Sequence, residues 1–117
     1  MKYKYSINDI PPSNNRFIGR NNKWQYIKEK KEWEELIYYS CNPKPKVPIN
    51  KAVVILHYFF KTKNRRDPDN YSGKFILDGL VKSGILKDDS FNNINLVLKA
   101  SLDKENPRTE INIISKE

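Results

Sequence analysis

Residues 51–61 constrain the fold of this chain more than any other segment. Aliphatic and aromatic side chains follow one another there almost without interruption, and His57 is the one strongly polar residue between Ala52 and Phe60. A run of this kind predicts a strand that is covered on both faces. It is far too short to cross a bilayer, so the sequence does not indicate a membrane protein.

Strand and helix patterns alternate around this run. The first segment alternates polar and apolar side chains, as a half-buried strand does, and two later segments place their apolar side chains on one helical face. Asn21 or Asn22 can cap the first helix, and Gly84 stands where a left-handed residue should end the second. Strands are predicted at 2–7, 51–61, 94–102 and 109–114, and helices at 22–39 and 70–83. The order β-α-β-α-β-β predicts an α+β fold, with a mixed sheet of about four strands and two main helices packed on it.

The size of the chain is that of one domain. Its 117 residues and 13.9 kDa lead us to expect a single domain over residues 1–117. The only cysteine, Cys41, excludes an intrachain disulfide and a zinc finger. Because the N-terminal residues do not resemble a secretion signal, we expect a cytoplasmic protein.

Positive charge is unevenly distributed. The formal net charge is +8, and residues 1–66 hold 15 basic and 5 acidic residues, whereas residues 67–117 hold 7 basic and 9 acidic ones. A basic half joined to a mildly acidic half is typical of a protein that binds a polyanion and carries a carboxylate site. The simpler interpretation is that the basic residues only keep a small protein soluble.

DNA binding is expected from the basic half. The candidates lie in the N-terminal turn, on the first helix, in a proline-rich connection and after the apolar strand. They are Asn14, Asn15, Lys23, Lys28, Lys30, Lys31, Lys44, Lys46, Lys61, Lys63, Arg65 and Arg66. Turn formation is the simpler role for the two asparagines, and we interpret His57, Trp24 and Trp33 as structural.

Two pairs of aspartates are the candidate chemical site. Asp67 and Asp69 follow the buried strand, and Asp88 and Asp89 follow the second helix. In extended backbone, side chains two residues apart point the same way, and Pro68 favours an extended Asp67. A strand, a helix and a return loop can bring both pairs to one edge of the sheet. Crowded carboxylates repel one another unless they bind a proton or a cation, and oxygen ligands alone suit Mg²⁺ or Mn²⁺.

A structural interpretation of the same acids is also open. Asp69 can be a helix cap, Asp67 a turn residue, and Asp88 and Asp89 part of a solvated loop. The arginines immediately before Asp67 favour the functional interpretation, because a metal beside a polyanion needs both kinds of charge.

At these residues the chain resembles the RusA-type Holliday junction resolvases, a family common in phages and prophages. The N-terminal Pro11-Pro12-Ser13-Asn14-Asn15 is also similar to the opening of that family, so the resemblance spans residues 10–115. The matching central motif consists of Arg65-Arg66-Asp67-Pro68-Asp69-Asn70, Lys74, Asp78-Gly79-Leu80, Gly84 and Asp88-Asp89-Ser90.

The resemblance implies a homodimeric, Mg²⁺-dependent endonuclease that resolves four-way DNA junctions by paired symmetric nicks, without a small-molecule cofactor. By position, Asp67, Asp69 and Asp89 would be metal ligands supported by Asp88, a metal-activated water would attack the phosphodiester, and Lys74 would stabilise charge on the phosphate. Three residues separate Asn70 from Lys74, where many relatives have two, and one residue turns a helical side chain by about 100°.

Two other functions remain open at the level of sequence. One is a catalytically inactive, basic DNA-binding module of the same fold. The other is a small RNA-binding protein in which Tyr58 and Phe60 stack bases on an exposed sheet face. A strand that is covered on both faces argues against the latter.

Overall fold

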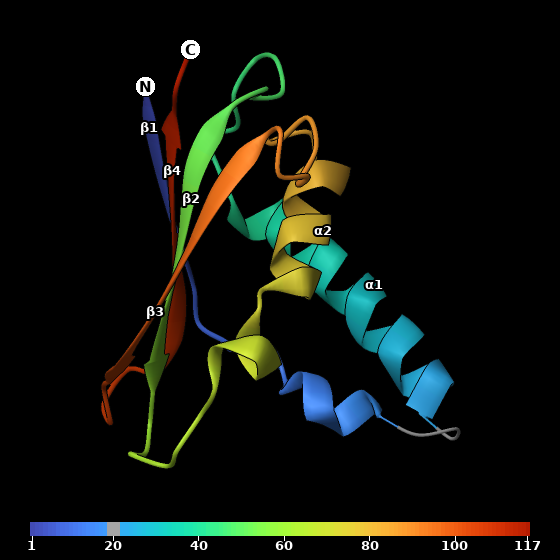
Figure 1. The fold of residues 1–117 in the computed structure, drawn as a ribbon, viewed down its shortest axis with the longest axis vertical. Helices are drawn as coiled ribbons and strands as arrows, with labels where there is room; N and C mark the ends of the chain where they lie inside the picture. Colours follow the sequence, from blue (N-terminus) through green and yellow to red (C-terminus); the bar gives the residue numbers. More distant parts are fainter. Residues whose placement is uncertain (19–21) are drawn as a thin grey trace.

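A computed structural model describes residues 1–18 and 22–117 of the chain. Four strands form one mixed sheet in the order β1-β4-β2-β3. Strand β2 pairs in parallel with β3 and antiparallel with β4, which pairs antiparallel with β1. Both α-helices lie on the same side of this sheet (Figure 1). The strands are β1 (Lys2–Ile7), β2 (Ala52–Phe60), β3 (Ile94–Leu102) and β4 (Arg108–Ser115); the helices are α1 (Lys23–Ser40) and α2 (Lys74–Lys82), with two 3₁₀ helices, η1 (Asn14–Phe17) and η3 (Pro68–Tyr71).

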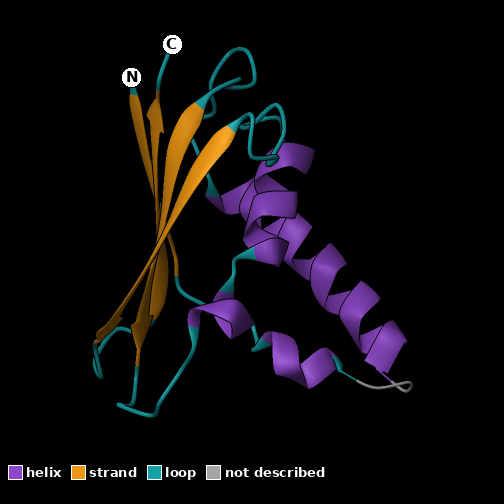
Figure 2. Ribbon diagram, in the orientation of Figure 1, coloured by secondary structure: helices purple, strands orange, loops and turns teal. Residues whose placement is uncertain are grey.

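This architecture confirms the predicted α+β fold, its element order and its two packed helices. Figure 2 shows the sheet and the helices as two layers, with the 3₁₀ helices below them. The predicted cap Asn21 lies outside the described residues, and Asn22 makes no side-chain cap hydrogen bond to α1. None of the helices in the described ranges is long and apolar enough to cross a membrane.

Strand β2 is covered on one face only, so the prediction of two covered faces is wrong. Its side chains alternate between buried and half-buried from Ala52 to Phe60. The buried set, which includes Tyr58, faces the helices, and the alternate set, which includes Phe59, lies on the open face of the sheet. The open face is only partly covered: His57 stacks on the Phe59 ring, and Arg108 of β4 lies over the same ring.

The core lies between the sheet and the helix pair. Trp33 and Ile37 of α1 are buried against α2, where a Cβ added to Gly79 would come within 2.9 Å of the Ile37 side chain. A glycine at this position therefore allows the two helices to approach closely. Cys41 is fully buried at the end of α1, and burial raises the pKa of its thiol to about 11. An un-ionised, inaccessible thiol of this kind is not a reactive nucleophile.

Helix α2 begins at Lys74, four residues later than predicted. Pro68–Tyr71 forms η3 instead, and Gly73 then adopts a left-handed conformation with φ of 82° before the helix starts. Lys74 is consequently the first residue of α2, rather than a residue one turn inside it. The left-handed Gly84 at the other end of α2, with φ of 83°, confirms the prediction made for that residue.

We expect Gly73→Ala to destabilise the protein by about 2–5 kcal/mol. A left-handed conformation costs a non-glycine residue about 1–2 kcal/mol, and overpacking in a core costs a further 1–3 kcal/mol. An added Cβ would overlap the Leu56 side chain. Urea unfolding of the two proteins measures the difference. Gly84→Ala is the matched control, because it has a similar φ but nothing within 4 Å of the added Cβ. Equal losses for the two variants would contradict the packing argument.

Candidate active site

The first aspartate pair lies where the loop after β2 turns into η3. Asp67 has extended backbone, as its position before a proline predicts, and its carboxylate accepts a hydrogen bond of 3.3 Å from Nε of Arg65. The extended geometry ends there, because Pro68 begins the 3₁₀ turn that contains the exposed Asp69. A proline fits the first position of a helical turn. The expectation that Asp67 and Asp69 continue a strand with parallel side chains is therefore wrong.

The second pair follows α2. Asp88 is exposed and Asp89 half-buried, and the Asp89 amide donates to the Asp88 carboxylate at 2.8 Å. Burial raises the pKa of Asp89, and the nearby carboxylates of Asp78 and Asp88 raise it further. Sequence reasoning did not group Asp78 with these acids. The available signal was its position, as the one acid on a helix with an otherwise largely buried, apolar sequence.

One aspartate of each pair borders the helix-facing side of β3. Asp67 lines a small groove of about 80 Å³ together with Tyr58 and Leu98. Asp89 lines a larger groove of about 610 Å³ together with Leu77 and Leu96. Leu96 and Leu98 point to the same side of β3, so the two grooves succeed each other along this strand. Asp67 and Asp89 thus lie along the same edge strand, on the loops that precede and follow α2.

The carboxylates do not crowd together as tightly as the sequence suggested. Within residues 1–18 and 22–117, no three His, Cys, Asp or Glu side chains are arranged to hold one metal ion. The chemistry of the donors nevertheless fits a hard divalent cation, since Asp89 is partly buried beside Asp78 and Asp88. The ligand roles of the aspartates stay predictions.

A buried hydroxyl adjoins the groove at Asp67. The hydroxyl of Tyr58 has no hydrogen-bond partner in the described part of the chain. Burial, followed by the nearby Tyr71, raises the pKa of Tyr58, so the hydroxyl keeps its proton and remains a donor. A buried donor of this kind needs an acceptor, and a bound water is the usual one.

Some of the predicted basic residues lie next to the first aspartate pair in the chain, and others lie on α1. Arg66 lies 4.0 Å above the Phe60 ring and donates to the carbonyls of Thr62 and Asn64, which shapes the loop before Asp67. Lys74 is exposed at the start of α2. Four further lysines and one arginine, spread over α1 and the loop after β2, are also exposed: Lys23, Lys31, Lys61, Lys63 and Arg65, whereas Lys30 is half-buried.

The two asparagines and the two tryptophans differ in exposure. Asn15 is exposed, but Asn14 donates its side-chain amide to other parts of the chain. Trp33 is in the core, as expected, whereas Trp24 is 80% exposed at the start of α1. The packing role expected for Trp24 is therefore wrong.

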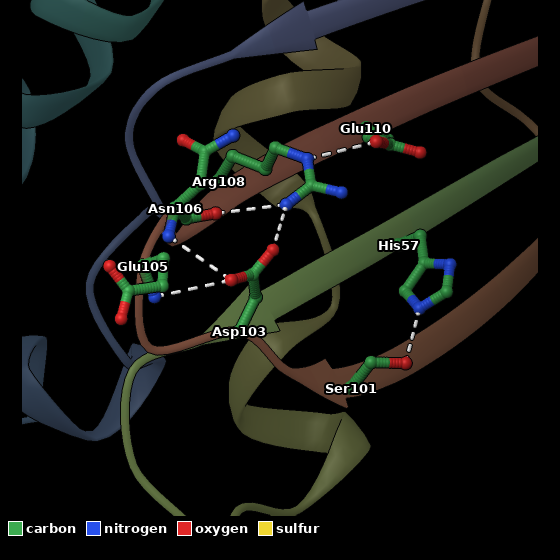
Figure 3. Close-up of polar contacts among 7 residues, drawn as sticks. All are labelled: His57, Ser101, Asp103, Glu105, Asn106, Arg108 and Glu110. Atoms are coloured by element: carbon green, nitrogen blue, oxygen red, sulfur yellow. Dashed lines mark hydrogen bonds and ion pairs between the residues drawn. The ribbon is translucent and has the colours of Figure 1, made fainter.

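The open face of the sheet holds a separate network of polar side chains (Figure 3). His57 lies 2.7 Å from the Ser101 hydroxyl and stacks on Phe59. Arg108 covers the Phe59 ring at 3.8 Å and bridges Asp103 and Glu110 at 2.8 and 2.9 Å. Since these groups satisfy one another and close the turn between β3 and β4, their contacts are structural.

Base stacking by Tyr58 and Phe60 is excluded by the fold. Their side chains are 2% and 7% exposed and belong to the core between sheet and helices. The RNA-binding interpretation depended on these two rings, so it is wrong in that form.

Comparison with protein families identifies a relationship over nearly the whole chain. A family model described as Endodeoxyribonuclease RusA matches residues 9–114. A comparison with curated proteins found no match. The matched range contains both aspartate pairs, Lys74 and the asparagines of the N-terminal turn.

Proposed function

Because the chain belongs to the family of RusA endodeoxyribonucleases, which cut Holliday junctions, we propose that it resolves four-way DNA junctions by paired symmetric nicks in a Mg²⁺-dependent reaction. The observation that carries this proposal is the family match over residues 9–114, and the position of Asp67 and Asp89 in grooves along β3 supports it.

The proposed cation ligands are the carboxylates of Asp67, Asp69 and Asp89, with Asp88 in support. Mn²⁺ is a plausible substitute for Mg²⁺, because both prefer oxygen ligands. When bound, such an ion supplies an activated water and neutralises charge on the phosphate. The partly buried Asp89 and the neighbouring carboxylates of Asp78 and Asp88 support the assignment, since a bound cation would offset their mutual repulsion.

Basic side chains close to the acids bind the phosphate and stabilise the negative charge that develops on it. Lys74, exposed at the first position of α2, would approach a phosphate that lies over η3, and its charge would stabilise the more negative transition state. Arg65 already pairs with Asp67 at 3.3 Å, so it can hold that carboxylate or turn to the phosphate. These side chains bind and orient the scissile group.

DNA binding is assigned to the basic residues of α1 and of the loop after β2. They neutralise phosphates without reading bases, which suits recognition of a branched shape rather than a sequence. A homodimer would place two such sites on the two strands that must be nicked, and it would double the net charge of the DNA-binding unit.

A labelled four-way junction tests the proposal directly. Incubation with Mg²⁺ should give symmetric nicks, and a chelator should abolish them. A linear duplex of the same sequence is the substrate control. If the protein binds the junction and never cuts it with Mg²⁺ or Mn²⁺, the catalytically inactive DNA-binding module is the correct interpretation.

Asp89→Asn should stabilise the folded protein at neutral pH. The raised pKa of Asp89 means that the folded state binds a proton more readily than the unfolded chain does. The free energy of unfolding therefore falls as the pH rises from the unfolded pKa of Asp89 through its higher folded pKa, and the amide removes this loss. Thermal unfolding should show a higher Tm for the variant at pH 7, and little difference at a pH low enough to protonate the carboxyl in both states. Asp69→Asn, at an exposed position, is the control; a lower Tm for Asp89→Asn at pH 7 would contradict the argument.

A further inference from the structure

We infer that Asn14 positions the loop that carries Asp67 and Asp69, as a clamp between the N-terminal segment and η3. The inference rests on the proposed function of that loop. It differs from the sequence-level expectation, in which Asn14 either formed a turn or contacted DNA.

The contacts are specific and span a long stretch of sequence. Nδ2 of Asn14 donates to the backbone carbonyl of Asp69 and to the hydroxyl of Ser72, both at 3.0 Å. A carbonyl oxygen only accepts hydrogen bonds, so the nitrogen of the amide must face Asp69. Both hydrogens of this nitrogen are then used inside the protein, and neither is free for a phosphate.

The clamp has a rigid base. The hydroxyl of Ser13 accepts the amide of Asn15 at 3.3 Å and caps η1. At the other end of η1, Phe17 packs edge-on against Phe75 and Tyr26, with ring centroids 5.6 and 5.5 Å apart. Because Phe75 belongs to the core, η1 is fixed to the body of the protein, and Asn14 is presented from a fixed position.

The loop needs an external support. Helix η3 is a single 3₁₀ turn, closed by a hydrogen bond of 3.0 Å from the Asn70 amide to the Asp67 carbonyl. On one side, Tyr71 packs edge-on against Phe60 and Tyr58. On the other side, Asn14 satisfies the Asp69 carbonyl. The two aspartates therefore sit on a short turn that is held between an aromatic contact and an amide clamp.

Loss of the clamp should affect chemistry more than binding. Misplacement of a reacting group by about 1 Å costs on the order of a hundredfold in rate, and loss of a contact that orients a metal ligand typically costs 10- to 100-fold. Asn14→Ala should therefore lower the single-turnover cleavage rate about 10- to 100-fold at saturating junction. It should also raise the Mg²⁺ concentration at half-maximal rate, while junction affinity without divalent ions changes less than about threefold.

Hydrogen exchange separates this role from general destabilisation. In Asn14→Ala, amides of residues 67–73 should exchange faster while those of β2 and β4 keep their protection. Ser72→Ala removes one of the two contacts and should give a smaller effect of the same kind, and the double variant should be less than additive. Asn42→Ala is the matched control, since it removes an amide-to-carbonyl contact of 2.9 Å to Tyr39, remote from the loop.

Three results would overturn the inference. One is weaker junction binding by Asn14→Ala with an unchanged rate at saturation, which indicates a direct DNA contact. Another is unchanged exchange of residues 67–73. The third is an equal loss of cleavage in Asn42→Ala. If Asn14→Ala does not fold, Ser72→Ala decides alone, and if the wild-type protein cuts no junction, the exchange measurement still tests the clamp separately from the proposed function.

Discussion

Asp67→Asn is expected to lower junction cleavage by about a thousandfold or more, while junction affinity stays the same or increases. The amide keeps the size of the side chain but loses the negative oxygen that a divalent cation needs. Charge neutralisation by a metal supplies several kcal/mol in the transition state, and each 1.4 kcal/mol is about tenfold in rate. Affinity should not fall, because the variant removes one repulsion between the protein and the DNA phosphates.

Single-turnover cleavage and equilibrium binding of the same labelled junction check this prediction. Glu105→Gln, an exposed acid in the turn between β3 and β4, is the control for loss of one negative charge. A variant at position 67 that cuts Mg²⁺-supplemented junctions at the wild-type rate would refute the assignment of Asp67. Asp89→Asn should lose cleavage in the same way and should differ from Asp67→Asn in its gain of stability at pH 7.

Junction affinity is expected to fall steeply with salt. If six to ten lysines and arginines of the binding unit contact phosphates, affinity should drop by roughly 10³–10⁵ between 50 and 200 mM salt, because each contact releases counterions. Fluorescence anisotropy over this range gives the slope of log Kd against log salt. Lys61→Ala and Lys63→Ala should each reduce the magnitude of the slope by about one, whereas Asp67→Asn and Asp89→Asn should not.

Lys104→Ala is a suitable control for this series, because Lys104 is an exposed lysine of the β3–β4 turn outside the basic half of the chain. Nearly constant affinity between low and moderate salt would mean that phosphate contacts contribute little, and the assignment of the basic residues would then be wrong.

Local patterns were sufficient to predict most of the fold. The structure confirms three predictions that rest on local preference alone. They are the strand at residues 2–7, the amphipathic second helix and the left-handed Gly84 at the end of that helix. Two errors arose where tertiary packing decides. One face of β2 is open because both helices pack on the other side of the sheet. Helix α2 starts late because Gly73, packed against the Leu56 side chain, adopts a left-handed conformation that is not helical.

The candidate site was less accessible from sequence. Spacing placed both aspartate pairs at ends of elements, but it could not give their separation, which depends on how α2 packs. The charge of Asp78 beside Asp89 is a tertiary contact. So is the turn of Asn14 toward Asp69, which joins residues 55 apart in the chain. Contacts of this kind leave no periodic signal.

Helix α2 is flanked by two left-handed glycines, Gly73 and Gly84, whose surroundings differ. It is about 13 Å long at 1.5 Å per residue, and its glycine contact with Ile37 fixes it to α1. Gly73 at one end is wedged against Leu56, whereas Gly84 at the other end has no atom within 4 Å of its missing side chain. Ile85 and Leu86, which follow Gly84, are buried and hydrogen-bond to Leu80 and Ile49, so the core holds this end of α2 as well. The separation of the two acidic loops is therefore set by the length of one short, fixed helix.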